Sequence, residues 1–447
     1  IAQAFGENFE QTLLESPEEI ARVAKIPMPV VENLRKVWNT SQQFNAAMTW
    51  LSGMGLTHHQ ITTLIEKMGN NAVAILKNDP YSVIHEIKGL SFKKIDPAAL
   101  KMGTAKENES RIRAGILHCV VEALGQGDCW VECEELVDRA NTLLIMDGLD
   151  SRDRIEHELN ALIHVKKLKC ADLGGRLVVA LPYIHKMEQD LAEIFAQASL
   201  DNPHFNLHED QDDLNERYNL GVLNDRQREA VSTALSSRIS LISGGAGTGK
   251  TYTISTLSAI CEDHDLDVIL TAPTGKAAKR LQESCGREAT TIHRLLGYNG
   301  EKFIRGADDP LNAQVLIVDE FSMTDVSLAW HLFQAVDFGH TFVVLVGDHN
   351  QLPPVGAGNI LRDLIQTRSI PTTILEHCVR QAGVLKENST AILRSEVRKT
   401  SEKRPDGRCD WYLVDHFTDP LGITDCLHEL FSNILEEKLG FDLLRDV

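Results

Sequence analysis

Near the middle of the chain stands the stretch Ile239-Ser240-Leu241-Ile242-Ser243-Gly244-Gly245-Ala246-Gly247-Thr248-Gly249-Lys250-Thr251, in which an apolar run of β type enters a glycine-rich turn. Residues 244–251 match the pattern G-x-x-x-x-G-K-[ST], and residues 253–257 are expected to leave the turn as a helix. Glycines let backbone N–H groups turn inward around phosphate oxygens, and a helix start adds free N–H groups and the positive end of a dipole. The stretch therefore predicts a nucleoside-triphosphate site, with a chance match of a Gly/Thr-rich turn as the alternative.

The residues that would hold the nucleotide lie in this loop and shortly before it. Lys250 is placed to reach the β- and γ-phosphates of ATP, and the Thr251 hydroxyl is placed to hold Mg²⁺. An amide side chain ahead of such a loop can pair with both edges of adenine, and Gln227 is the candidate. The expected nucleotide-binding residues are Gln227, Gly245, Ala246, Gly247, Thr248, Gly249, Lys250 and Thr251.

Apolar runs after the loop alternate with helical patterns. Residues 268–272 read as a buried strand that leads through a turn into a helix, and residues 315–318 and 342–346 read as two more buried strands. This βαβ alternation predicts a parallel sheet with helices on both faces. Residues 223–370 are therefore expected to form an α/β domain around the glycine-rich loop.

Two of these strands end in residues suited to phosphate chemistry. Asp319 follows residues 315–318 and would order the Mg²⁺ shell, and Glu320 stands where a general base would polarise the attacking water. After the strand at 342–346, Gln351 can hydrogen-bond the γ-phosphate. A strand that simply ends in acids is the alternative interpretation.

Polar turns also follow the strand at 268–272. That turn is expected to expose Thr271, Thr274 and Lys276, which could bind a second polyanion beside the nucleotide, and residues 290–294 form a similar polar turn. Ordinary surface loops are the alternative.

The first 112 residues read as short helices separated by glycine and proline, with a weak internal repeat. The pattern of residues 5–26 recurs in residues 68–90, and a Gly-rich turn at 51–56 lies between the two copies. Apolar–Gly–apolar turns between short helices suit helix-hairpin-helix units, whose turn amides bind a DNA phosphate without reading bases. Lys25 stands where the second copy has Gly89, which leaves a purely structural role open for the first copy. A small helical bundle without a ligand is the alternative.

Residues 113–196 predict a different domain. Residues 112–124, 134–144 and 153–163 have helical periodicity, and two short apolar runs flank Gly174-Gly175 as in a hairpin. Three helices followed by a hairpin predict a winged-helix-like α+β domain. Its lysines could meet a phosphate backbone or form a solvated face; they are Lys166, Lys167 and Lys169. Residues 197–222 contain a short acidic run and are expected to be a linker.

The bulk composition is that of a soluble globular protein of roughly three domains at about 150 residues each. The 447 residues are 43% hydrophobic and 24% charged, and no apolar run approaches the roughly 18 residues of a membrane span. Nine scattered cysteines indicate a reducing cytoplasm, and the spacing of Cys129 and Cys133 does not suit zinc. A net charge of −19 opposes binding of nucleic acid by bulk electrostatics but leaves room for a narrow DNA channel. No signal peptide is apparent, and a chain that opens on Ile1 is expected to be a fragment, a processed product, or one without its first residues.

With these residues taken together, the chain resembles superfamily-one DNA helicases of the RecD/TraA type. It is most similar to the stand-alone RecD-like ATP-dependent helicases that work without RecB and RecC partners. Residues 376–381 resemble the motif whose arginine, here Arg380, reaches the γ-phosphate across a cleft. The other motifs that carry the resemblance are residues 244–251, 271–278, 291–293, 316–320 and 347–353.

The resemblance implies two RecA-like domains with ATP between them, of which residues 371–447 would supply only the beginning of the second. It implies 5′-to-3′ movement on single-stranded DNA, unwinding at junctions of single and double strands in DNA repair or recombination, and no obligate protein partner. The late motifs of the second domain are absent before Val447, so we expect a truncated longer helicase; the other possibility is a protein that cannot complete its ATPase cleft. The residues expected to contact DNA are Thr271, Pro273, Thr274, Lys276, Thr291 and His293.

Two other functions remain open at this stage. The N-terminal helices and the winged-helix-like domain could bind DNA while the P-loop portion only binds ATP as an inert scaffold. A P-loop kinase is a weaker third hypothesis, since no acceptor pocket or lid is evident in the sequence.

Overall fold

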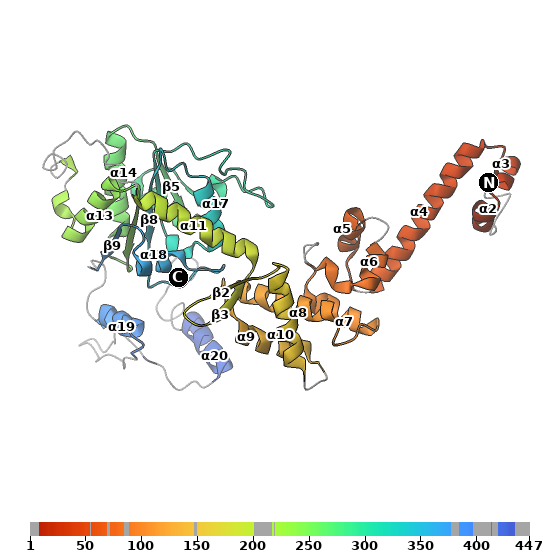
Figure 1. Ribbon diagram of the computed structural model, residues 1–447. Coiled ribbons are helices and arrows are strands. Elements are labelled where there is room, and N and C mark those ends of the chain that lie inside the picture. Colours follow the sequence, from red (N-terminus) through yellow and green to blue (C-terminus); the bar gives the residue numbers. More distant parts are fainter. Residues whose placement is uncertain are drawn as a thin grey trace. The chain divides into compact units, whose positions relative to one another are not determined.

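The computed structural model describes residues 9–53, 55–68, 72–84, 89–146, 150–200, 217–218, 220–376, 384–396, 413 and 419–433 (Figure 1). The chain forms two compact units. The first contains residues 1–194 with 323–334 and 353–360, and the second contains 195–322, 335–352 and 361–447. Within the described residues, no helix is long and apolar enough to cross a membrane.

The first unit begins with a series of helices joined by tight turns. Three of these turns share one backbone feature: Lys25, Gly55 and Gly89 have φ angles of 51°, 75° and 83°, in the left-handed region. Each of the three is followed by an apolar residue, one further residue and then the start of a helix. The predicted repeat is thus seen in the backbone, although its residues 5–8, 69–71 and 87–88 lie outside the described part of the chain. The elements are α2 (Phe9–Glu15), α3 (Pro17–Ala24), α4 (Met28–Gly53), α5 (His58–Met68), α6 (Ala72–Asn78), η3 (Pro80–Val83) and α7 (Phe92–Lys101).

An α+β arrangement follows in the same unit. The three predicted helices and the hairpin are present, and the hairpin carries a third, antiparallel strand in the order β1-β3-β2. Strand β1 was not predicted, because two residues are too few to show an alternating pattern. The elements are α8 (Glu109–Gly125), β1 (Val131–Glu132), α9 (Cys133–Leu144), α10 (Ser151–His164), β2 (Lys169–Asp172), β3 (Leu177–Ala180) and α11 (Pro182–Leu200).

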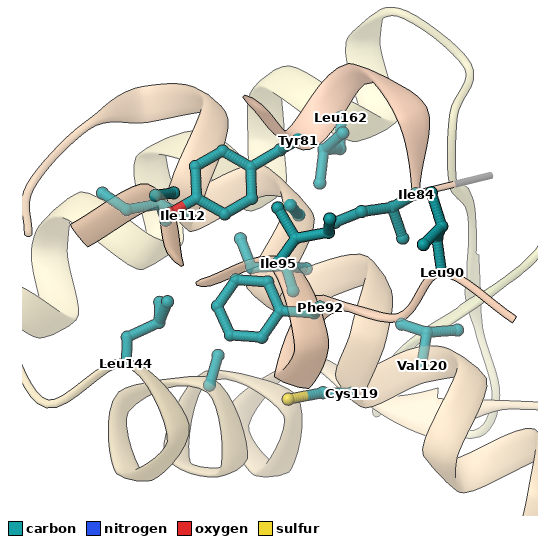
Figure 2. Packing of buried hydrophobic residues seen from close by; sticks show 14 of the residues in the cluster. Tyr81, Ile84, Leu90, Phe92, Ile95, Ile112, Cys119, Val120, Leu144 and Leu162 are labelled. Carbon is teal, nitrogen blue, oxygen red and sulfur yellow. The ribbon is translucent and has the colours of Figure 1, made fainter. Parts of the chain in front are cut away.

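One continuous apolar core runs through both parts of this unit. Its buried residues extend from Leu51 to Val179. Figure 2 shows its centre, where the Tyr81 and Phe92 rings stack with centroids 5.9 Å apart and Ile112 of α8 lies near them. The boundary predicted near residue 112 falls inside α8, whose buried face serves the helices before it and the helices after it.

A buried ion pair lies beside this core. The Arg111 guanidinium donates from Nε to Asp96 Oδ1 at 2.7 Å and from Nη2 to Asp96 Oδ2 at 2.9 Å. Tyr81 Oη donates to the same Asp96 Oδ1 at 2.7 Å, and Arg111 Nη2 also donates to the Leu144 carbonyl at 2.9 Å. The pair therefore ties η3, α7, α8 and the end of α9 together.

Two short segments from far along the sequence complete the first unit. On α17 (Val326–Gln334), Trp330 Nε1 donates to Asp190 Oδ2 of α11 at 3.0 Å. The Gly358 N–H donates to the Gly127 carbonyl at 2.9 Å. Both segments are thus anchored to the α+β arrangement.

The second unit is built on a six-stranded parallel sheet in the order β6-β5-β7-β8-β4-β9. Residues of α13, α14 and α15 pack together with sheet residues in one apolar core. The predicted parallel α/β architecture is confirmed. The strands are β4 (Ile239–Gly244), β5 (Val268–Ala272), β6 (Ala289–Thr291), β7 (Val315–Val318), β8 (Phe342–Gly347) and β9 (Thr372–Leu375). The helices are α13 (Asp225–Ser236), α14 (Lys250–Asp263), α15 (Gly275–Cys285), α16 (Ile292–Leu295) and α18 (Ile360–Thr367). Two short 3₁₀ turns are η4 (Leu220–Val222) and η5 (Phe321–Met323).

Strand β9 differs from the prediction. Residues from 371 onward were expected to begin a second domain, but β9 pairs with β4 in the register Gly244↔Leu375 and forms the edge of the first sheet. Its four residues alternate in burial, as expected for an edge strand. Beyond it the structure describes α19 (Val384–Leu393) and α20 (Pro420–Glu429), and no second parallel sheet appears among the described residues.

Candidate nucleotide site

The glycine-rich loop follows β4 directly and ends in α14, which begins at Lys250 rather than at the predicted Thr253. Gly249 has a φ of 84° and is the N-cap of α14. A Cβ on Gly249 would lie 2.2 Å from Gln227 Nε2, and a Cβ on Gly244 would lie 2.9 Å from the Leu375 carbonyl oxygen. Gly244 therefore requires glycine because the loop passes close to the backbone of β9, and Gly249 requires it because of its left-handed φ.

Polar groups inside the loop hold its shape. Lys250 Nζ donates to the carbonyls of Gly244 at 2.5 Å and Gly245 at 3.1 Å, and the Thr248 hydroxyl donates to the Gly245 carbonyl at 2.9 Å. The first turn of α14 has no side-chain cap, and Thr251 is exposed there. An uncapped helix start beside an ammonium group is a site suited to a polyphosphate.

Gln227 is held inside the protein, and its pairing with adenine stays a prediction. It is only 5% exposed, and its Nε2 donates to the Thr248 carbonyl at 3.1 Å. Its Oε1 accepts from the Asn224 N–H at 3.0 Å as part of the capping box of α13. One N–H of the amide and one acceptor site of its oxygen are thus bonded inside the protein. Gln227 fixes the loop to the start of α13.

The two acids predicted for catalysis lie at the end of β7. Strand β8 separates β7 from β4, so the acids emerge about 10 Å from the loop, given a strand spacing of about 4.8 Å. Burial raises the pKa of Asp319 to about 6, with the neighbouring Glu320 charge adding to the effect and Lys250 opposing it. The Glu320 N–H donates to Asp319 Oδ1 at 2.9 Å.

Glu320 itself is strained. Its φ of 51° lies in the left-handed region, which residues other than Gly, Asn and Asp rarely adopt. Its Oε2 atom is buried and has no hydrogen-bond partner among the described residues. A buried carboxylate oxygen without a partner is costly, and both features are typical of functional sites.

Gln351 lies after the end of β8, in a turn closed by Asp348. Asp348 is 4% exposed and accepts from the Asn350 N–H at 3.0 Å, while the Gln351 N–H donates to the Asp348 carbonyl at 3.1 Å. Gln351 Nε2 lies 3.4 Å from Asp348 Oδ2, so the side chain folds back on its own turn. Arg380, the remaining predicted catalytic residue, lies outside the described residues.

The residues predicted to contact DNA gather at the ends of β5 and β6, which are adjacent strands paired through Ala272↔Thr291. Thr274 accepts from the Ala277 N–H at 3.3 Å as the N-cap of α15, and Thr291 accepts from the Arg294 N–H at 3.2 Å as the N-cap of α16. Pro273 is half-buried, and Lys276 and His293 are exposed.

Thr271 does not belong to this exposed group. Its side chain is 0% exposed, and its hydroxyl donates to the Thr290 carbonyl at 2.9 Å, across to β6. The prediction that Thr271 is exposed at the turn is wrong, because the residue lies inside β5, one position before the strand ends.

An aromatic group beside His293 was missed in the sequence. The His293 ring lies 5.5 Å from Tyr298 and 5.5 Å from Phe303 between centroids, and Tyr298 and Phe303 are 4.9 Å apart. Tyr298 is 44% exposed. The signal available was two aromatic residues in an otherwise polar loop, which alone has no specific meaning.

A cluster of side chains preformed for a metal ion is not found among the described residues. Within the part of the chain that the structure describes, no group of three His, Cys, Asp or Glu residues could hold a metal ion.

Comparisons with known proteins agree with this geometry. Residues 40–130 match the family described as the helix-hairpin-helix domain of ATP-dependent RecD2 DNA helicases, and residues 222–409 match a family of AAA domains. An ATP-dependent RecD2 DNA helicase from Deinococcus radiodurans is 28% identical over 416 residues, which cover 90% of this chain and 57% of that protein. The RecD subunit of the RecBCD enzyme from Mycobacterium tuberculosis H37Rv is 39% identical over 170 residues, covering 33% of this chain and 29% of that protein.

Among solved structures, the Pif1 helicase from Candida albicans aligns at 24% identity over 38% of this chain and 44% of that chain, with a TM-score of 0.30, which is too low to bear on the fold. The chain spans less than two thirds of the length of both curated relatives. The two matched families cover the helical and the P-loop portions separately, and the Deinococcus relative covers both in one alignment. Over most of its length, the chain is therefore similar to the RecD-like ATP-dependent DNA helicases.

Proposed function

We propose that this chain binds ATP with Mg²⁺ at the glycine-rich loop and couples ATP hydrolysis to 5′-to-3′ movement along single-stranded DNA. Duplex unwinding in DNA repair or recombination would follow from that movement. The observation that carries the proposal is Glu320, whose strained backbone and unpartnered buried Oε2 lie two strands from the loop. A carboxylate held in this way is suited to accept the proton of an attacking water.

The residues present fit ATP and a divalent cation. The glycines at 244 and 249 let the loop pack closely against β9 and α13, and the uncapped start of α14 supplies free N–H groups. Thr251 and Asp319 would hold the cation together with phosphate oxygens. When bound, Mg²⁺ neutralises charge on the phosphoryl oxygens.

The chain's own groups would then act on the phosphates and on water. The Lys250 ammonium would exchange its two carbonyl partners for the β- and γ-phosphates. Glu320 would orient a water and take its proton, and Gln351 would turn from Asp348 to the γ-phosphate. Arg380 would approach the same phosphate from the facing side of a cleft.

The strand ends of β5 and β6 suit the backbone of a single DNA strand. Thr274 and Thr291 stand at two adjacent helix starts, where N–H groups attract phosphates. Lys276 would add a charge, and Pro273 and His293 would make close contacts with the strand. Thr271 has no part in this proposal.

The N-terminal part would add further DNA contacts. The order of α8, β1, α9, α10, β2 and β3 supports a winged-helix assignment. Its third helix carries arginines that are already paired, Arg152 with Asp138 and Arg154 with Asp150. DNA contacts through Gly55 and Gly89 in the helix-hairpin-helix turns are therefore favoured over the reading of DNA bases by α10.

The first test is ATP hydrolysis with and without single-stranded DNA, measured on this chain and on any longer protein that contains it. We expect the rate to rise several-fold when single-stranded DNA is added, because strand binding would bring the catalytic groups together. If ATP and DNA both bind but the rate does not respond to DNA, the alternative of a DNA-binding module with an inert P-loop scaffold is supported.

The second test concerns direction. Partial duplexes with a 5′ single-stranded tail are expected to be unwound, and otherwise identical duplexes with a 3′ tail are expected to remain paired. Native gel electrophoresis measures the fraction of each substrate that is unwound. If only the 3′-tailed substrate is unwound, the proposed 5′-to-3′ direction is contradicted.

A further inference from the structure

A histidine links the turn that carries Gln351 to the strand that carries the glycine-rich loop. His349 Nδ1 lies 2.8 Å from the Ser243 hydroxyl. Ser243 is 0% exposed and directly precedes Gly244, and His349 directly follows Asp348. The ring thus spans the ends of two adjacent strands, β4 and β8, which are paired in the register Ser243↔Gly347.

The end of β8 is confined on its other side as well. A Cβ on Gly347 would lie 3.1 Å from the Ser322 N–H nitrogen, in the turn that follows Glu320. The Asp348 turn therefore lies between the nucleotide loop and the acids. Any movement of that turn changes where Gln351 stands relative to both.

We propose that His349 is a positioning residue, which holds the Asp348–Gln351 turn against the glycine-rich loop through its hydrogen bond to Ser243. It does not touch the nucleotide. The hydrogen bond keeps Gln351 within reach of the γ-phosphate and limits the fraction of time that the turn spends away from the site. The expected effect of His349 on kcat rests on the proposed ATP hydrolysis. The expected effect of His349 on the position of the turn does not.

A positioning role and a proton-transfer role of the pair differ in what they require of residue 349. A serine hydroxyl can donate to a neutral Nδ1 or accept from a protonated Nδ1–H, so the link survives a change in the charge of the ring. A positioning role therefore needs only a polar atom at the place of Nδ1. A proton-transfer role needs the imidazole itself.

The test uses three replacements of His349 and one of Ser243. The amide nitrogen and oxygen of asparagine are separated from the backbone by as many bonds as Nδ1 of histidine. Those of glutamine are separated by as many bonds as Nε2. His349→Asn is therefore expected to behave as the original protein, and His349→Gln as His349→Ala. Ser243→Ala is expected to match His349→Ala, and the double variant should be no worse than either single one.

Two measurements read out these variants. Amide hydrogen exchange in residues 348–352 is expected to rise roughly two- to tenfold in Ser243→Ala and His349→Ala, the range that the loss of one hydrogen bond gives. In DNA-stimulated hydrolysis, kcat should fall by a similar factor while KM for ATP stays unchanged. His340→Ala is the matched control, because this exposed histidine bonds Asp337 at the opposite end of β8, and both readouts should stay unchanged.

Unchanged exchange in the alanine variants, additive losses in the double variant, or a failure of His349→Asn to restore the original values would each overturn the proposal. If the original protein shows no DNA-stimulated hydrolysis, the proposed function fails. The exchange measurement then still decides whether His349 holds the turn.

Discussion

Replacing Glu320 with glutamine is expected to lower kcat for ATP roughly a hundred- to ten-thousandfold, the range attributed to a positioned general base. Glutamine keeps the size of the side chain and inherits the same left-handed backbone, so the comparison isolates the negative charge on the unpartnered Oε2. Nucleotide affinity should change little, because the groups that hold the phosphates lie on β4 and α14. Steady-state hydrolysis with single-stranded DNA and equilibrium binding of a fluorescent ATP analogue measure the two effects separately.

Lys250→Ala gives the contrasting result. Its ammonium now bonds the Gly244 and Gly245 carbonyls in the loop, so its loss should weaken both nucleotide binding and hydrolysis.

Glu283→Gln is the matched control for Glu320→Gln, since Glu283 is exposed on α15 and pairs only loosely with Lys279 at 3.9 Å. A Glu320→Gln protein that hydrolyses ATP within tenfold of the original would remove Glu320 from the role of general base.

The local parts of the nucleotide site follow from sequence because neighbouring residues determine them. The glycine positions, the strand before Gly244 and the acids after Val318 are set by short-range backbone requirements and by buried apolar runs. The parallel sheet follows from the alternation of such runs with helices. These features need no knowledge of which strands become neighbours.

Long-range pairing explains what the sequence could not predict. β9 joins the first sheet because Leu375 meets Gly244, and nothing in residues 372–375 indicates that partner. Thr271 is buried because β6 supplies an acceptor for its hydroxyl. Gln227 bonds Thr248, 21 residues away, only because α13 and the loop come together in the folded sheet.

The second large effect is expected in the stability of the first unit. Asp96→Ala should lower the free energy of unfolding by about 3–5 kcal/mol, the cost of removing one partner of a buried ion pair. The Arg111 side chain is only 3% exposed, so it would keep its charge without its carboxylate. Urea unfolding followed by circular dichroism measures the change.

Two further variants distinguish the expected loss of stability in Asp96→Ala from a simple packing defect. One removes another hydrogen bond to Asp96, and the other is a matched control at an exposed ion pair. Tyr81→Phe removes one hydroxyl that donates to Asp96 and should cost only about 1 kcal/mol. Asp150→Ala breaks an exposed pair with Arg154 and should leave the unfolding midpoint nearly unchanged.

The decisive variant replaces both charges. Burial alone would lower the pKa of Arg111, yet its pKa lies above the usual value because Asp96 stabilises the charged form. The cost of Asp96→Ala should therefore come mainly from the stranded guanidinium and not from lost volume. An Asp96→Leu, Arg111→Met double variant should then be more stable than Asp96→Ala, since apolar side chains often replace a buried pair at little cost. If the double variant is the less stable of the two, the pair contributes through its links to Tyr81 and Leu144, and the origin assigned here to the loss is wrong.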